Sequence, residues 1–182
     1  MFEVNVNRLS DARDILPVTV SEHDVILEEM TLGRTVCITG QIRSRNVYAE
    51  AEKRNKLILT LFADDIKMDG GFPDDTNDVV LDGFLCKPVV FRVTPSGREI
   101  ADLLVAVDRR HDNSDYIPCV AWGRYAQKAS KCGVGDRVRL VGRMQSRGYQ
   151  KQLDDGQVLD KIAYEVSVSK VYTDFEQENK SV

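Results

Sequence analysis

The stretch Asp115-Tyr-Ile-Pro-Cys-Val-Ala-Trp-Gly123 alternates between two kinds of side chain. Ile117 and Cys119 lie on one face, which is small and apolar enough for a core, whereas Tyr116 and Trp122 lie on the other. Alternation with a period of two residues predicts a β-strand with one buried face.

The segments on either side of this strand complete a small barrel. The region 124–132 is the only helical stretch, and Gly133 and Gly135 end it, because glycine best tolerates a left-handed helix end. The other expected strands are 79–94 (broken near Pro88), 98–110, 137–149 and 162–172, with a turn at 95–97. Five strands with one helix between the third and fourth predict an oligonucleotide/oligosaccharide-binding (OB) barrel.

The same pattern occurs earlier in the chain. Asp14-Ile-Leu-Pro-Val-Thr-Val20 aligns with the strand at 115–121 at a shift of 101, and 33–45 aligns with 135–147 at a shift of 102. Phe2 already matches Leu103, in the second strand of the later copy. We therefore expect an all-β protein with one short helix per repeat: two tandem five-stranded Greek-key OB barrels, the first lacking its first strand.

Charge divides along the same boundaries. The expected parts are a shortened OB fold at 1–68, a linker at 69–78 rich in Gly, Pro, Asn and Asp, a complete OB fold at 79–172, and an acidic tail at 173–182. Residues 1–78 carry 9 basic and 15 acidic residues, a net −6, whereas 79–172 carry 15 and 11, a net +4. The positive potential that attracts phosphates therefore lies in the second half.

Composition excludes several classes of protein. With 42% hydrophobic and 30% charged residues in 182, the chain is typical of a globular protein, and no apolar run is long enough for a membrane span or a signal peptide. We expect a cytoplasmic protein. The four cysteines form no CxxC motif, and neither histidine lies at metal-ligand spacing, so we expect no metal and no cofactor.

One face of the later copy combines cations with aromatic rings. The strand at 137–149 places Arg139, Arg143 and Arg147 on the face that also carries Tyr149, and Tyr116 and Trp122 share the outward face of the preceding strand. Single-stranded nucleic acid requires cations along its phosphates and flat rings under its bases. Further candidate contacts are Arg98, Arg110 and His111. Two alternatives stay open: the arginines could only solvate the sheet, and the rings could pack at a rim or interface.

These segments resemble the bacterial single-stranded DNA-binding proteins of the SSB family. The likeness covers roughly 79–172 and is carried by Thr94-Pro-Ser-Gly97, Leu104-Val-Ala-Val-Asp-Arg-Arg110, the stretch 115–123, and Val141-Gly-Arg-Met-Gln-Ser-Arg-Gly-Tyr149. The resemblance implies binding of single-stranded DNA without sequence preference in replication, repair and recombination, by four OB barrels. The family's base-stacking positions correspond to His111, Tyr116, Trp122 and Tyr149.

The chain departs from the family pattern in two places. The family's flexible linker with an acidic-hydrophobic tip has no counterpart in 175–182, which puts recruitment of other proteins by that route in doubt. In the first copy, Ile15 and Ser21 stand where the second has Tyr116 and Trp122. A copy that keeps its core but not its stacking positions indicates a scaffold or interface.

Other functions are weighed against this one. The chain has no HxH, HExxH, GxSxG or phosphate-loop motif, so we expect no enzyme and no small-molecule substrate. An assembly or primosome-type module with weak nucleic-acid binding remains the alternative, and RNA is not excluded as a ligand. We expect a homodimer, in which two chains supply four OB barrels and the open edge of the first barrel pairs with a second chain.

Overall fold

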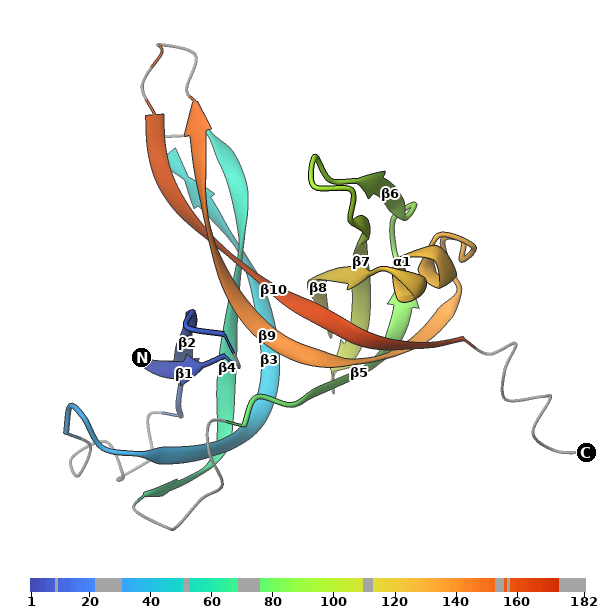
Figure 1. Cartoon of the computed structure of the whole chain (residues 1–182). Helices are drawn as coiled ribbons and strands as arrows, with labels where there is room; N and C mark the ends of the chain where they lie inside the picture. Colours follow the sequence, from blue (N-terminus) through green and yellow to red (C-terminus); the bar gives the residue numbers. More distant parts are fainter. Residues whose placement is uncertain are drawn as a thin grey trace, which may run out of the picture. The chain divides into compact units, whose positions relative to one another are not determined.

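The computed structural model describes residues 1–8, 10–21, 31–50, 53–68, 76–109, 113–152, 156 and 158–173. The chain divides into two compact units, Met1–Thr76 and Asn77–Val182. Strands dominate both units (Figure 1). Residues 69–75 of the expected linker and 174–182 of the expected tail lie outside the described residues.

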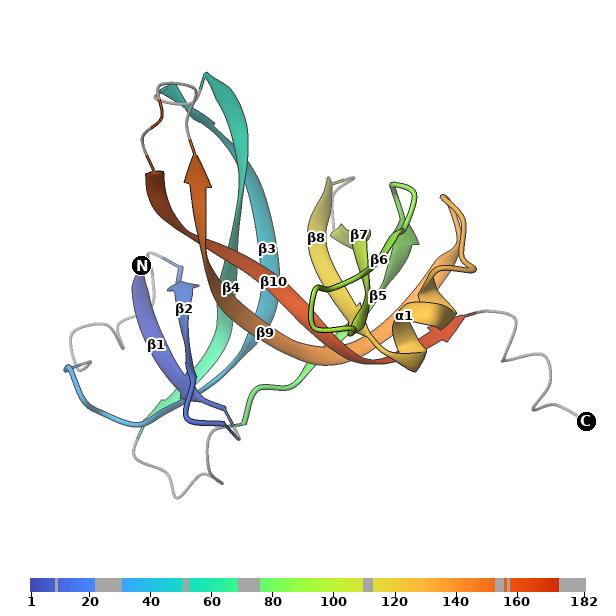
Figure 2. The same ribbon diagram turned by 45° about the horizontal axis from the view of Figure 1, so that its top comes forward.

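The second unit is a closed barrel of the OB type. Its elements are β5 (Val79–Leu85), β6 (Val90–Val93), β7 (Glu99–Arg109), β8 (Asn113–Trp122), α1 (Arg124–Ala129), β9 (Arg137–Gln152) and β10 (Val158–Thr173). The strands follow the order β5-β9-β10-β8-β7-β6, and β5 also pairs with β7 through Phe84 and Leu85 (Figure 2). This second pairing closes the ring β5-β9-β10-β8-β7, and the OB fold predicted from the sequence is confirmed.

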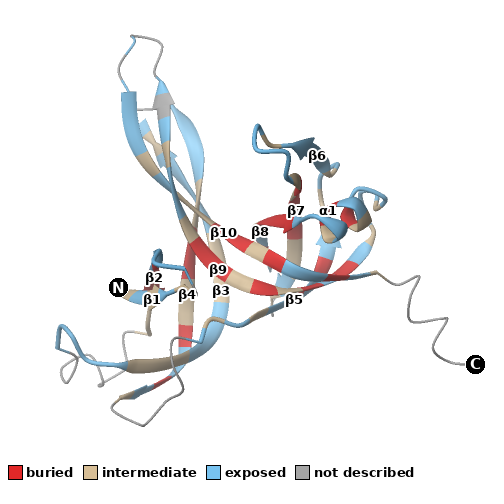
Figure 3. Ribbon diagram, viewed as in Figure 1, coloured by how far each residue is buried: buried red, intermediate tan, exposed pale blue. Residues whose placement is uncertain are grey.

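Alternate residues of these strands fill the barrel. Ile117 and Cys119 of β8 are each 1% exposed, and Leu140 of β9 is fully buried. Figure 3 shows these buried positions as bands that are interrupted by intermediate or exposed ones along β7 to β10. The opposite parity therefore faces outward, as the period of two residues predicts.

The break expected near Pro88 separates β5 from β6, because proline cannot donate a ladder hydrogen bond. The helix differs in detail from the sequence expectation. The helix ends at Ala129 rather than Cys132, and a turn with Gly135 at φ 91° leads into β9. This short α1 leaves the described part of the chain without a helix of the length and apolar character needed to cross a membrane.

The first unit is an open sheet of four strands. β1 (Phe2–Asn7), β2 (Arg13–Thr19), β3 (Val36–Ala49) and β4 (Arg54–Met68) follow the order β1-β2-β4-β3. This is the order of β7-β8-β10-β9, and the described residues of this unit contain no counterpart of β5. The helix expected between β2 and β3 falls on residues 22–30, outside the described part of the chain.

Strand register repeats between the two sheets. Val18 pairs with Leu61 in the parallel β2–β4 contact, and Cys119 pairs with Val166 in the parallel β8–β10 contact. Val18 and Cys119 are related by the shift of 101 found in the sequence, and Leu61 and Val166 are related by a shift of 105. A buried aspartate also recurs: Asp14 accepts a hydrogen bond from Arg8, and Asp115 accepts one from Arg109 at 3.0 Å.

A glycine permits each sheet to bulge at the same point. Gly40 and Gly142 each lie at a register shift, opposite a partner strand that carries one extra residue. A Cβ on Gly142 would lie 2.1 Å from the backbone oxygen of Ser167, and one on Gly40 would lie 2.0 Å from that of Phe62. Any larger side chain would force the two strands apart.

We therefore expect Gly142→Ala to lower the free energy of unfolding of the second unit by about 1–3 kcal/mol, as overpacking does elsewhere. Gly148→Ala on the same strand is the matched control, because no heavy atom lies within 4 Å of the added Cβ. Urea titrations followed by the fluorescence of Trp122, the single tryptophan, measure both variants. If both variants changed the free energy of unfolding equally, the close approach of Gly142 to Ser167 would not restrict the side chain at this position.

Candidate nucleic-acid interface

The paired strands β9 and β10 carry a row of polar and aromatic side chains on their outer face. Core residues such as Leu140 and Val166 point into the barrel, so the alternate positions point away from it. We call these alternate positions the outer row. In cross-strand pairs, from the hairpin end toward α1, it consists of Tyr149–Lys161, Arg147–Ala163, Gln145–Glu165, Arg143–Ser167, Val141–Lys170 and Arg139–Tyr172.

Trp122 leans against the middle of the outer row. Its indole Nε1–H donates to Ser167 Oγ at 3.2 Å, and its side chain remains 38% exposed. Since Ser167 is the cross-strand partner of Arg143, this contact brings the indole beside the cationic row. Tyr116, 43% exposed, lies on the same side of β8. The sequence predicts that Tyr116 and Trp122 share the outward face of β8. The hydrogen bond to Ser167 brings Trp122 to the outer row.

A buried carboxylate occupies the centre of the row. Gln145 Nε2 donates to Glu165 Oε1 at 2.8 Å, and Arg147 donates to both Glu165 oxygens at 3.1 and 3.4 Å. The Arg147 guanidinium also lies 5.9 Å from the centroid of the Tyr149 ring. Gln145, which the sequence places among open polar side chains, is only 5% exposed. Its burial follows from the hydrogen bond to Glu165.

The other candidate cations lie in different surroundings. Arg139 is exposed and pairs across the strands with Asp82 of β5 and Tyr172 of β10. The Asp82 carboxylate accepts two hydrogen bonds from Arg137, at 2.8 and 3.1 Å. Arg98 is exposed at the turn before β7, where its N–H donates to Thr94 Oγ1. Arg110 and His111 lie outside the described residues.

Three residues of β10 belong to the outer row although the sequence did not indicate them: Lys161, Lys170 and Tyr172. Strict alternation from Val166 and Val168 would place Lys170 and Tyr172 inside the barrel. The bulge between Val168 and Lys170 reverses the parity, so Val171 is buried and its neighbours face outward. In the sequence, only the polar neighbours of Val171 indicate that Val171, rather than Lys170 or Tyr172, faces the core.

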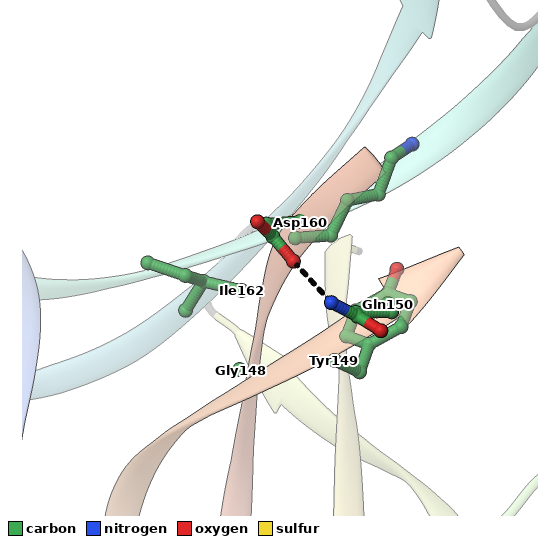
Figure 4. A pocket seen from close by; sticks show the side chains of 6 residues that line it. Gly148, Tyr149, Gln150, Asp160 and Ile162 are labelled. Atoms are coloured by element: carbon green, nitrogen blue, oxygen red, sulfur yellow. Dashed lines mark hydrogen bonds between the residues drawn. The ribbon is translucent and has the colours of Figure 1, made fainter. Parts of the chain in front are cut away.

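A hollow lies where the β9–β10 hairpin extends beyond the barrel. Gly148, Tyr149, Gln150, Asp160, Lys161 and Ile162 line it. Gln150 and Asp160 turn toward each other across the strands, and their side chains hydrogen-bond at 3.2 Å (Figure 4). Tyr149 and Lys161 of the outer row therefore border an open recess rather than packed core.

Metal ligands and reactive thiols are the features of the described residues that bear on catalysis. These residues contain no group of three or more His, Cys, Asp or Glu side chains that could hold a metal ion. Burial raises the pKa of the Cys119 thiol, and it also raises the pKa of Cys86 and Cys132. A raised pKa disfavours the thiolate, which is the nucleophilic form.

Comparison with known families agrees with this geometry. The sequence profile of the Single-strand binding protein family matches residues 76–174, more than half of the chain. The chain belongs to this family. The match covers the whole second unit as the structure describes it, including every residue of the outer row.

Single-stranded DNA-binding proteins of several bacteria are similar to part of the chain. Single-stranded DNA-binding protein 1 of Streptococcus pyogenes is 37% identical over 83 residues, which are 42% of this chain and 64% of that protein. Single-stranded DNA-binding protein A of Bacillus subtilis is also 37% identical over 83 residues, covering 42% of this chain and 48% of the relative. The chain thus spans less than two thirds of these relatives.

Solved structures extend the likeness in fold to most of the chain. The crystal structure of the wild-type single-stranded DNA binding protein from Thermus aquaticus has a TM-score of 0.71 at 20% identity, and covers 89% of this chain and 70% of that one. A deletion variant of the same protein gives a TM-score of 0.72 at 19% identity, with 94% and 78% covered. This similarity confirms the OB fold of the single-strand binding protein family.

Proposed function

We propose that the protein binds single-stranded DNA without sequence preference and protects it during replication, repair or recombination. The observation that carries the proposal is the row of cations along β9 and β10, with an aromatic ring at each end, Tyr149 and Tyr172, and the indole of Trp122 against its middle. A single strand presents a charged backbone and unpaired bases, and this row has a partner for each. Family membership and the names of the relatives support the same ligand.

The outer row and the two rings of β8 divide the roles according to their chemistry. Trp122, Tyr116 and Tyr149 would stack bases, and Tyr172 would add a fourth ring near α1. Arg139, Arg143 and Arg147 would contact phosphates, with Lys161 and Lys170 beside them on β10. Arg98, at the turn before β7, and Arg110 and His111, which follow β7 in the sequence, would make further contacts with the DNA.

Titration with oligothymidine at several salt concentrations tests this function. Trp122 is the single tryptophan, so its emission reports binding in the middle of the outer row. Salt-dependent binding with quenching is expected, because a stacked base changes the environment of the indole. Binding that leaves the emission unchanged would place the bases elsewhere. An oligouridine of equal length measures how far RNA competes.

We infer that the first unit serves assembly and that two chains associate to supply four OB barrels. The positions that match Tyr116 and Trp122 are Ile15 and Ser21, so this unit lacks the equivalent rings. Its sheet is open: β1 and β3 are its edges, and neither pairs with a further strand among the described residues. Unpaired edges favour association with another chain.

Light scattering at micromolar concentration should accordingly give a mass of twice the 20.5 kDa chain. The expected dimer should persist at high salt, because strand pairing rests on backbone hydrogen bonds rather than on surface charge. A monomer that still binds oligothymidine would separate the two proposals and leave only DNA binding standing.

A further inference from the structure

We propose that Glu165 is a positioning residue that holds the Arg147 guanidinium against Tyr149 and thereby presents the Tyr149 ring to a base. This inference rests on the proposed binding of single-stranded DNA. It assigns a purpose to a negative charge that lies in the middle of a surface otherwise suited to phosphates.

The position of Glu165 needs an explanation. A carboxylate on a phosphate-binding face opposes the ligand, and a buried carboxylate is stable only when it is paired and hydrogen-bonded. Glu165 is 7% exposed, and it is satisfied from one side by Gln145 and from the other by Arg147. All three side chains belong to the outer row.

The contacts form a continuous path from the carboxylate to the ring. Arg147 reaches both oxygens of Glu165 with two nitrogens, which fixes the plane of its guanidinium. The same guanidinium lies 5.9 Å from the centroid of the Tyr149 ring, within the range of a cation–π contact. Tyr149 stands where the hairpin leaves the barrel, beside the hollow, so it has little packed core to hold it.

The first unit provides an internal comparison. Its cross-strand pair Arg43–Thr60 stands where the second unit has Gln145–Glu165. Thr60 is buried and lies within 3.3 Å of the Thr19 hydroxyl. The position that matches Tyr149 is Val47 in this unit. The sheet without the ring therefore also lacks the carboxylate.

Glu165→Gln should change DNA binding in two opposite ways. It removes a negative charge that opposes phosphates on this face and offsets Arg147, so the slope of log K against log salt should steepen by up to about 0.7, the contribution of one phosphate contact. It also loosens Arg147 from Tyr149, so binding extrapolated to 1 M salt should weaken by up to about tenfold, within the range for a base–aromatic stack. The two salt titrations should therefore cross.

Three comparisons make the test specific. In a Tyr149→Ala background, Glu165→Gln should still steepen the slope but should no longer weaken binding at 1 M salt. Glu165→Asp keeps the charge and should keep the slope of the wild type. Urea unfolding of each variant tests whether the barrel is intact, and Trp122, which donates a hydrogen bond to Ser167, reports binding in all of them.

The outcomes separate this inference from the proposed function. A wild-type chain that does not bind oligothymidine overturns both. Wild-type binding together with a uniform loss at every salt concentration in Glu165→Gln overturns only the inference, because it indicates a purely structural carboxylate. A loss of binding at 1 M salt that persists in the Tyr149→Ala background also overturns only the inference, because such a loss does not depend on the Tyr149 ring.

Discussion

Trp122→Ala is expected to weaken binding of oligothymidine by about 1–3 kcal/mol, roughly 5- to 150-fold in the dissociation constant. The indole lies beside Arg143 and is held there by the hydrogen bond to Ser167, so its face is fixed before a base arrives. Because the variant has lost the single tryptophan, anisotropy of a labelled oligonucleotide is the measurement.

Two variants control this experiment. Trp122→Phe keeps a ring at the same position and loses only the indole N–H, so it should retain most of the affinity. Tyr125→Ala removes an aromatic ring of α1 that stacks with Arg124 and does not belong to the outer row, so it should leave binding unchanged. Equal affinity of Trp122→Ala and the wild type, with the fold intact, would rule out stacking on this ring.

The double variant Arg139→Gln, Arg143→Gln should flatten the salt dependence by about 1.4 units of log K against log salt, since each phosphate contact on a single strand contributes about 0.7. Binding at low salt should fall steeply, whereas binding near 1 M salt should change little. Arg147 is left in place because its removal would strand the buried Glu165 carboxylate, which would confuse a loss of contact with a loss of stability.

Arg124→Gln combined with Lys131→Gln is the matched control for this prediction. Both residues are exposed at or beside α1, and their substitution changes the net charge by the same amount. This control should leave the slope within about 0.3 units of the wild type, because neither residue belongs to the outer row. If both double variants flatten the slope equally, general charge governs binding and the outer row has no special part.

The outward parity of β8 and β9 was predictable because neither strand contains the extra residue of a bulge. Tyr116 and Trp122, and likewise Arg139 and Arg143, therefore fall on the expected side. β10 was not predictable in this way, since the bulge before Lys170 reverses its parity and depends on the close approach of Gly142 to Ser167. A glycine in a strand signals such an approach only when its partner strand is known.

Burial of polar residues was the other feature that the sequence could not supply. Gln145 and Glu165 are twenty positions apart and meet only because β9 and β10 pair in one register. Alternation assigns Gln145 to the outward face correctly, but it cannot show that a carboxylate of the next strand covers it. The early end of α1 at Ala129 similarly depends on the tight turn that leads into β9 rather than on helix propensity.

The ring of strands in the second unit is joined very unevenly. β9 and β10 are held by fifteen residue pairs, whereas the β5–β7 closure consists of Phe84 with Ala106, Leu85 with Val105 and the hydrogen bond from the Cys86 N–H to the Leu104 oxygen. Local opening follows the weakest boundary of a fold. The long β9–β10 hairpin, which carries the outer row, should therefore keep its shape when the ring of strands fluctuates.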